Sequence, residues 1–144
     1  MVSMILQPQH SRFTLRVYWE DTDAGGIVYH TRYLAFMDRA RTEWMRGLGY
    51  DQRQLQHAYG IVFVVRSAEI DFLSPAHLDD KLEITVDVQS CKRVSVLFRQ
   101  VVYRQQQSLA TALVRLAALD ADKFKPCQIP NPIYTEVKAL ETML

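Results

Sequence analysis

The sequence predicts an α+β fold in which an antiparallel sheet wraps around one long helix. Only residues 31–48 repeat their apolar side chains at helical spacing over a long stretch, whereas most of the chain after residue 60 has the pattern of strands. A polar segment typical of a hairpin turn joins the last two of these strands. Because one helix is separated in sequence from a run of hairpin-linked strands, the α+β class is favoured.

The first half of the chain is predicted to contain one strand and two helices. Residues 13–19 alternate between apolar and polar, which indicates a half-buried strand with Trp19 on its buried face. Residues 31–48 predict the long helix, with Thr31 as N-cap. A short second helix is expected to be capped by Asp51. The apolar stripe of the long helix consists of Tyr33, Phe36, Met37, Ala40 and Trp44.

The second half is predicted to consist mainly of strands. β-Branched and aromatic residues indicate one over 61–72, strict alternation indicates another over 82–88, and residues 94–103 form a third. Residues 109–119 allow two interpretations, because their Ala and Leu content favours a helix, while their length and their position after a turn favour a strand. We predict a strand, since tertiary context outweighs propensity. Prolines then interrupt the chain, and residues 134–144 are expected to form a terminal helix.

The bulk composition indicates one ordinary globular unit. The chain has 144 residues, which predicts a single domain over 1–144 with residues 1–10 and 127–144 at its periphery. The net charge of +1 gives no support to nucleic-acid binding. No apolar run reaches the roughly 20 residues of a membrane span, and the first residues do not resemble a secretory signal. Two distant cysteines without CxxC spacing favour a reducing, cytoplasmic location and no structural zinc site.

The segment between the first strand and the long helix carries the chemistry of this sequence. Residues 18–30 read Tyr-Trp-Glu-Asp-Thr-Asp-Ala-Gly-Gly-Ile-Val-Tyr-His. A carboxylate at this place faces the positive end of the helix dipole and unbonded backbone N–H groups. These are the groups needed to attack a carbonyl and to stabilise the oxyanion that results. Gly25 and Gly26 either let the backbone approach a substrate or only form the turn.

This segment and its continuation resemble the hotdog-fold acyl-CoA thioesterases, most closely the Tol-Pal-associated bacterial enzymes related to 4-hydroxybenzoyl-CoA thioesterase. The resemblance implies a hotdog domain with Asp23 as the catalytic carboxylate and the amide of about His30 as the oxyanion donor. It also implies that subunits share the site in a homodimer or a homotetramer of paired dimers, and that Lys92 and Arg93 meet the coenzyme A phosphates. The matching residues, beyond 20–30, are Tyr33, Ala40, Arg41, Glu43, Asp71, Phe72, Pro75, Ala76, Leu78, Asp79 and Asp80.

The roles of the individual side chains stay open at this point. Asp23 can attack a thioester directly and form a mixed anhydride, or it can activate a water as general base. His30 can orient the substrate or Asp23, or supply only its backbone amide. Tyr29 can line an acyl pocket or belong to the core. Lys92 and Arg93 can bind phosphates or form a solvated turn. Asp21 is expected to cap or solvate the loop.

The leading functional hypothesis is therefore hydrolysis of an acyl-CoA thioester to a free acid and coenzyme A. Coenzyme A is then part of the substrate, and neither a cofactor nor a metal is expected. The alternative is an interaction module without this activity, or one directed at acyl-carrier-protein thioesters, that associates with envelope or lipid-synthesis proteins.

Overall fold

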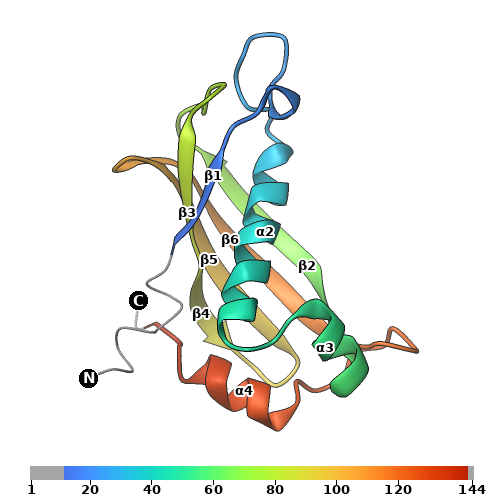
Figure 1. Cartoon of the computed structure of the whole chain (residues 1–144). Coiled ribbons are helices and arrows are strands. Elements are labelled where there is room, and N and C mark those ends of the chain that lie inside the picture. The colour runs from blue at the N-terminus through green and yellow to red at the C-terminus, as the bar shows by residue number, and fades with distance from the viewer. Residues whose placement is uncertain (1–11, 143–144) are drawn as a thin grey trace.

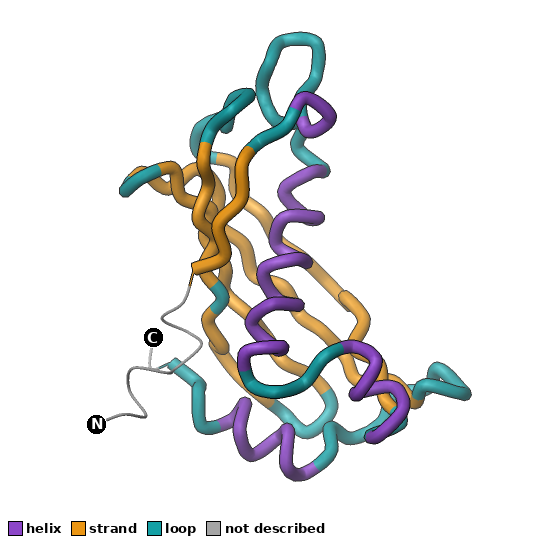
Figure 2. Tube along the Cα trace, in the orientation of Figure 1, coloured by secondary structure: helices purple, strands orange, loops and turns teal. Residues whose placement is uncertain are grey.

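The computed structural model describes residues 12–142, so the lead-in expected at residues 1–10 lies outside the described part of the chain. A six-stranded antiparallel sheet curves around one long helix, α2 (Arg32–Gly47), which runs along its concave face (Figures 1 and 2). The predicted fold class is thus confirmed. The order across the sheet is β1 (Arg12–Arg16), β3 (Lys81–Thr85), β5 (Ser95–Arg104), β6 (Gln107–Asp120) and β2 (Ile61–Phe72), with β4 (Asp87–Cys91) paired to β5.

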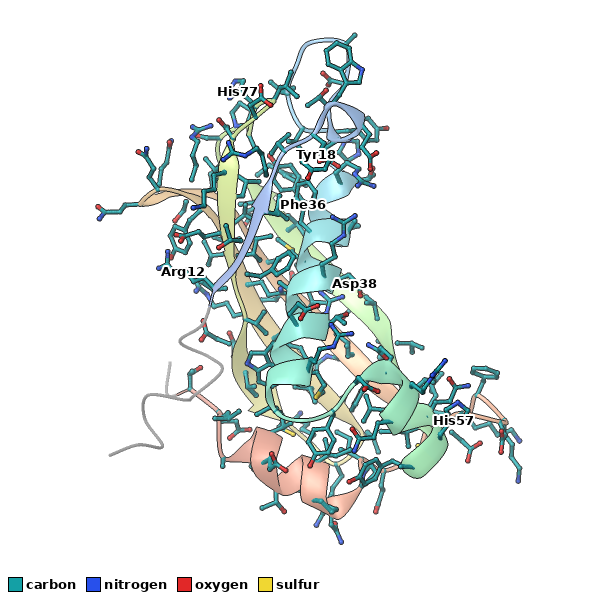
Figure 3. All side chains as sticks on the ribbon, viewed as in Figure 1. Arg12, Tyr18, Phe36, Asp38, His57 and His77 are labelled. Carbon is teal, nitrogen blue, oxygen red and sulfur yellow. The ribbon has the colours of Figure 1, made fainter. Side chains whose placement is uncertain are left out.

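Helix α2 packs through the predicted stripe. Tyr33, Phe36, Met37, Ala40 and Trp44 are all buried, and Phe36 points from the helix toward the sheet (Figure 3). Full burial of one such large apolar side chain stabilises the fold by about 1.5–3 kcal/mol, so the stripe fixes the helix on the sheet. Thr31 occupies the N-cap position as predicted, but its side chain makes no capping hydrogen bond. The first turn of α2 is held by other contacts, which belong to the site described below.

Two shorter helices close the other end of the sheet. Asp51 caps α3 (Gln52–Ala58) as predicted, since its carboxylate accepts a 2.7 Å hydrogen bond from the Gln54 N–H. Helix α4 (Asn131–Lys138) begins and ends earlier than the expected 134–144, whose last two residues lie outside the described part. It has proline in its first turn, where no N–H is needed. It buries Ile133 and Val137 in the main hydrophobic core. This part of the 127–144 segment, which the sequence places at the periphery, therefore contributes to the core.

The strand predictions hold with two exceptions. The region 109–119 is a strand, inside β6. The strand expected over 82–88 is divided near Val86 into β3 and β4, because β3 lies between β1 and β5 whereas β4 pairs with an earlier part of β5. The strand expected to reach Trp19 ends at Arg16, and the prediction that Trp19 is buried is wrong, since this residue is 80% exposed. A 3-10 turn over Trp19–Asp21 replaces the end of that strand.

Candidate active site

The segment that carries Asp23 is a tight turn closed by backbone hydrogen bonds. The Asp23 N–H donates to the Ile27 carbonyl at 2.9 Å, and the Gly26 N–H donates to the Asp23 carbonyl at 3.1 Å. Gly26 has a φ of +79°, a conformation that favours glycine. At Gly26, the positive φ of the turn is therefore a sufficient reason for glycine.

The Asp23 carboxylate is exposed at this turn and lightly bonded. Its Oδ1 accepts a 2.8 Å hydrogen bond from the Gly25 N–H, and within residues 12–142 its Oδ2 has no partner. A Cβ added at Gly25 would lie 3.4 Å from Oδ1, which is van der Waals contact, so residue 25 lies directly against the carboxylate. The turn thus fixes one oxygen of Asp23 and leaves the other available to solvent or a substrate.

The start of α2 supplies unbonded donors on the same stretch of chain. Among the described residues, the N–H groups of His30 and Thr31 have no hydrogen-bond acceptor, whereas the Tyr29 N–H donates to the Asp21 carbonyl at 3.0 Å. These N–H groups lie at the positive end of the helix dipole. They have the character of an oxyanion site, because they offer preorganised donors that need no rearrangement.

Asp21 anchors the turn to the helix. Its side chain is 6% exposed, and its Oδ2 accepts from the Tyr18 N–H at 2.9 Å. Its Oδ1 accepts from Arg32 Nε and Nη2 at 3.0 and 2.8 Å. The expected capping role is present, but the ion pair with Arg32 was not foreseen. Residues eleven positions apart are joined here through a loop, and no local sequence pattern indicates such a pair.

A shallow apolar pocket of about 250 Å³ opens beside the helix start. Its walls include Tyr33, Phe72 and Leu73, with His30 at the rim. The His30 and Phe72 rings meet edge to face at 6.3 Å, and the Tyr29 ring lies 4.6 Å from that of His30. Tyr29 is half exposed and is not among the residues that line this pocket. The chain therefore places an apolar surface, a histidine and free N–H groups together.

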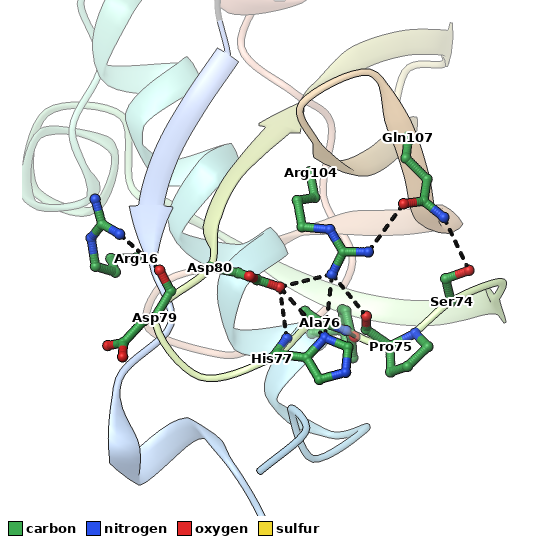
Figure 4. A network of polar contacts seen from close by, with 10 residues as sticks. Arg16, Ser74, Pro75, Ala76, His77, Asp79, Asp80, Arg104 and Gln107 are labelled. Atoms are coloured by element: carbon green, nitrogen blue, oxygen red, sulfur yellow. Dashed lines mark hydrogen bonds and ion pairs between the residues drawn. The ribbon is translucent and has the colours of Figure 1, made fainter.

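Residues 74–80, whose polar side-chain contacts are drawn in Figure 4, hold the turn through backbone hydrogen bonds. The Val28 N–H donates to the Ala76 carbonyl at 2.8 Å, and the Leu78 N–H donates to the Gly26 carbonyl at 3.1 Å. The Tyr33 hydroxyl accepts a 3.1 Å hydrogen bond from the Ala76 N–H. Burial raises the pKa of Tyr33, an effect that the Ala76 hydrogen bond only partly offsets, so the phenol stays neutral as an acceptor.

Lys92 and Arg93 lie at the opposite end of the sheet from Asp23 within one subunit. Arg93 Nη1 donates to Asn131 Oδ1 at 2.8 Å, and its guanidinium stacks 4.2 Å above the Tyr134 ring. The ten residues of β5 separate this turn from the Asp23 end, which at about 3.3 Å per residue amounts to roughly 30 Å. One chain alone does not bring these cations to the carboxylate.

The acidic, histidine and cysteine side chains in the described part of the chain form no metal centre. No three of them gather in a way that could hold a metal ion, and His57 and His77 lie at opposite ends of the molecule (Figure 3). None of the helices in the described residues is long and apolar enough to cross a membrane.

Comparison with known proteins agrees with this geometry. Residues 17–137 match the model of the Thioesterase-like superfamily. The acyl-CoA thioesterase YbgC of Haemophilus influenzae is 44% identical over 127 residues, covering 88% of this chain and 90% of that protein. The acyl-CoA thioester hydrolase YbgC of Escherichia coli O157:H7 is 41% identical over 128 residues, covering 88% of this chain and 95% of that protein.

A solved structure extends the comparison to three dimensions. The crystal structure of a probable thioesterase from Bartonella henselae superposes with a TM-score of 0.78 at 35% identity, covering 83% of this chain and 98% of that chain. The resemblance drawn from residues 20–30 and their continuation is confirmed by these matches. This chain is a hotdog-fold member of the Thioesterase-like superfamily.

Proposed function

We propose that this protein is an acyl-CoA thioesterase that hydrolyses its substrate to a free acid and coenzyme A. The observation that carries the proposal is an exposed, half-bonded Asp23 carboxylate on the same loop that ends at the unbonded N–H groups of His30 and Thr31. The names of the relatives from Haemophilus and Escherichia support the same activity. Water is the only co-reactant, so the proposed reaction needs neither a metal nor a cofactor.

The reaction begins when a thioester carbonyl oxygen accepts from the N–H groups at the start of α2. The negative charge that develops on this oxygen is stabilised by these donors and by the helix dipole. In one route Asp23 removes a proton from the water that attacks the carbonyl carbon; the tetrahedral intermediate then collapses, the C–S bond breaks, and the departing thiolate of coenzyme A takes up the proton from Asp23. In the other route Asp23 attacks the carbonyl carbon itself and expels the thiolate of coenzyme A, which takes up a proton from water. In the second case water then hydrolyses the mixed anhydride, and Asp23 is regenerated.

The decisive experiment replaces Asp23 by asparagine. The amide keeps the shape of the side chain and can still accept from the Gly25 N–H, but it can neither act as a base nor attack as a carboxylate. We expect kcat to fall by about 10²–10⁴-fold on a panel of short-chain, long-chain and aromatic acyl-CoAs. Asp122→Asn is the matched control, because Asp122 is an exposed acid in the connection between β6 and α4. Equal turnover by Asp23→Asn and the wild type would refute the proposal.

A labelling experiment separates the two routes. In a single turnover in ¹⁸O-water, incorporation of the label into the Asp23 carboxylate is expected only if the anhydride forms and water attacks its Asp23 carbonyl. A label found only in the product acid is expected from general-base catalysis and also from attack of water on the acyl carbonyl of an anhydride. Mass spectrometry of the rapidly quenched enzyme then decides, because only the anhydride route adds the mass of the acyl group to the protein. Absence of any hydrolysis by the wild type would instead favour the non-catalytic interaction module, and turnover only of acyl-carrier-protein thioesters would favour the carrier-directed alternative.

We propose that the functional unit is at least a dimer formed through β2. Among residues 12–142, this 12-residue strand lies at one edge of the sheet and pairs on one side only, with β6. Val64, Val65 and Phe72 along it are exposed. A long apolar edge of this kind is a template for pairing with a second strand. Antiparallel pairing of two copies about a two-fold axis gives the unpaired backbone N–H and carbonyl groups of both β2 edges their hydrogen-bond partners.

This arrangement accounts for the distance between Asp23 and the two cations. Phe72, at one end of β2, lines the pocket beside His30, whereas the turn with Lys92 and Arg93 lies near the other end, where the Ala118 N–H donates to the Val94 carbonyl. Antiparallel pairing reverses the second strand, so the partner subunit's Lys92 and Arg93 approach the Asp23 end of the first subunit. There they would bind the phosphates of coenzyme A.

Two measurements test the assembly. Light scattering is expected to give twice the mass of the chain for a dimer, or four times that mass for a tetramer of paired dimers. Val65→Lys places a charge on the proposed edge and is expected to yield monomers, whereas Lys92→Gln with Arg93→Gln is expected to raise KM without changing the mass. A monomeric, fully active wild type would contradict the shared site.

The free thiols of Cys91 and Cys127 suit the proposed cytoplasmic location.

A further inference from the structure

The turn that carries Asp23 depends for its position on residues 74–80, which are themselves irregular. The hydrogen bonds from Val28 and Leu78 described above join the two segments, and Ile27 and His77 form an isolated antiparallel bridge. Asp79, inside the supporting segment, has a φ of +72°, which is strained for a residue with a side chain. A segment with a strained turn needs contacts from elsewhere to hold a single conformation.

Those contacts come from Arg104, at the end of β5 (Figure 4). Its Nη1 donates to Asp80 Oδ2 at 2.8 Å and to the Pro75 carbonyl at 3.2 Å. Its Nη2 donates to Gln107 Oε1 at 3.0 Å. The Asp80 carboxylate also accepts from the His77 N–H at 2.8 Å. A single planar guanidinium therefore ties both ends of the 75–80 segment to the β5–β6 hairpin.

The side chains of this network are partly shielded from water. The Arg104 side chain is 27% exposed and that of Asp80 is 23% exposed, so their ion pair is screened less than one on the open surface. Lysine could not replace Arg104 fully, since an ammonium lacks the planar fork that reaches Asp80, Pro75 and Gln107 together. The contacts that hold residues 75–80 therefore require arginine at position 104.

We propose that Arg104 is a positioning residue for the catalytic turn, acting through residues 75–80 on the backbone of Gly26 to Val28. Its hydrogen bonds within the described residues do not include Asp23, and it does not line the pocket beside His30. This inference rests on the proposed thioesterase activity for its kinetic consequence, but its structural consequence can be measured without any substrate.

The test compares Arg104→Met and Arg104→Lys with the wild type. In Arg104→Met, we expect the amide hydrogens of Val28 and Leu78 to exchange about 10-fold faster, with no change at Val114 in the centre of β6. On an acyl-CoA that the wild type hydrolyses, kcat is expected to fall about 10-fold while KM changes less than about threefold. Arg104→Lys is expected to lie between the two. Arg46→Met is the control, because it removes an exposed guanidinium and its ion pair at the far end of α2.

The outcomes separate this inference from the proposed function. Normal amide protection at Val28 and Leu78 in Arg104→Met overturns the positioning role, whatever the activity. Faster exchange with unchanged kcat also overturns it, because Arg104 would then serve stability alone. A wild type without thioesterase activity refutes the proposed function, while amide exchange still decides whether Arg104 holds the turn. If Arg104→Met fails to fold, the same amide exchange is measured in Gln107→Met, which removes one acceptor of the guanidinium. Faster exchange at Val28 and Leu78 in that variant supports the positioning role, and unchanged exchange overturns it.

Discussion

The Asp21 carboxylate and the Arg32 guanidinium form a two-donor ion pair at the base of the turn that carries Asp23, with N–O distances of 3.0 and 2.8 Å. The same carboxylate accepts from the Tyr18 N–H, and the Asp21 carbonyl accepts from the Tyr29 N–H. One buried residue thus fixes the end of β1, the turn and the first residue of α2 relative to one another.

Loss of this ion pair is expected to destabilise the protein. Asp21→Ala leaves the Arg32 guanidinium and the Tyr18 N–H without their acceptor, which costs about 2–3 kcal/mol in the free energy of unfolding. Glu83→Ala is the comparison, because its pair with Arg12 is about 40% exposed on both sides and contributes less than about 1 kcal/mol. Urea titration of both variants measures the difference. Equal losses would show that Asp21 acts as an ordinary surface acid.

Substitution of Gly26 tests the backbone requirement of the turn. A Cβ there meets no atom within 4 Å, so the cost of Gly26→Ala comes from its positive φ alone and is about 1 kcal/mol. Gly47→Ala has equal space but lies in α2, where alanine is favoured, and is expected to raise stability by about 0.5 kcal/mol. Opposite shifts in melting temperature are the expected result. A shift of the same sign in both variants would contradict this explanation.

Acid stability is expected to depend on Asp80. Burial alone would raise the pKa of its carboxyl, but the hydrogen bonds from Arg104 and the His77 N–H outweigh burial and lower it. A carboxyl with a lowered pKa contributes stability that is present above its ordinary value and is lost as pH falls through the lowered value. In Arg104→Met the pKa of Asp80 rises, so the loss should begin at a higher pH. Melting temperatures of the wild type and Arg104→Met between pH 2.5 and 6 measure this shift. Profiles of the same shape in both proteins would show that the Asp80–Arg104 ion pair does not contribute to acid stability.

Thiol labelling provides a test of packing near α4. Cys91 is fully buried, and this burial, together with the Glu141 charge, raises the pKa of its thiol to about 11. Only about one molecule in a thousand then carries the thiolate at pH 8, and the sulfur is also inaccessible. Iodoacetamide at pH 8 should leave Cys91 unmodified in the folded protein and label it in urea, as mass spectrometry will show. Rapid modification of the native protein would mean that α4 leaves this part of the sheet.

Local patterns in the sequence predicted the elements of this fold well. The strand over 61–72 coincides with β2, because β-branched residues and the following proline define both its body and its end. The helical stripe is correct because its burial depends only on a spacing within the segment. Trp19 was misplaced, since alternation cannot show that the Asp21 side chain bonds the Tyr18 N–H and turns the chain away from the sheet.

Contacts between distant segments were beyond such patterns. The sequence places Asp23, His30 and the glycines on one loop, and the structure shows how that loop is built. The sequence gives no sign that Arg104 supports the loop, because 24 residues and a change of strand separate Arg104 from Asp80. It likewise gives no sign that Lys92 and Arg93 lie at the far end of the sheet, since that placement follows from the direction of β5.

The pocket wall at Phe72 and Leu73 belongs to a different part of the chain from the proposed reacting groups. Substitutions at the end of β2 are therefore expected to reshape the proposed acyl-binding surface while leaving Asp23 and the helix N–H groups in place. In such a division, the choice of substrate and the chemical step can vary independently of each other.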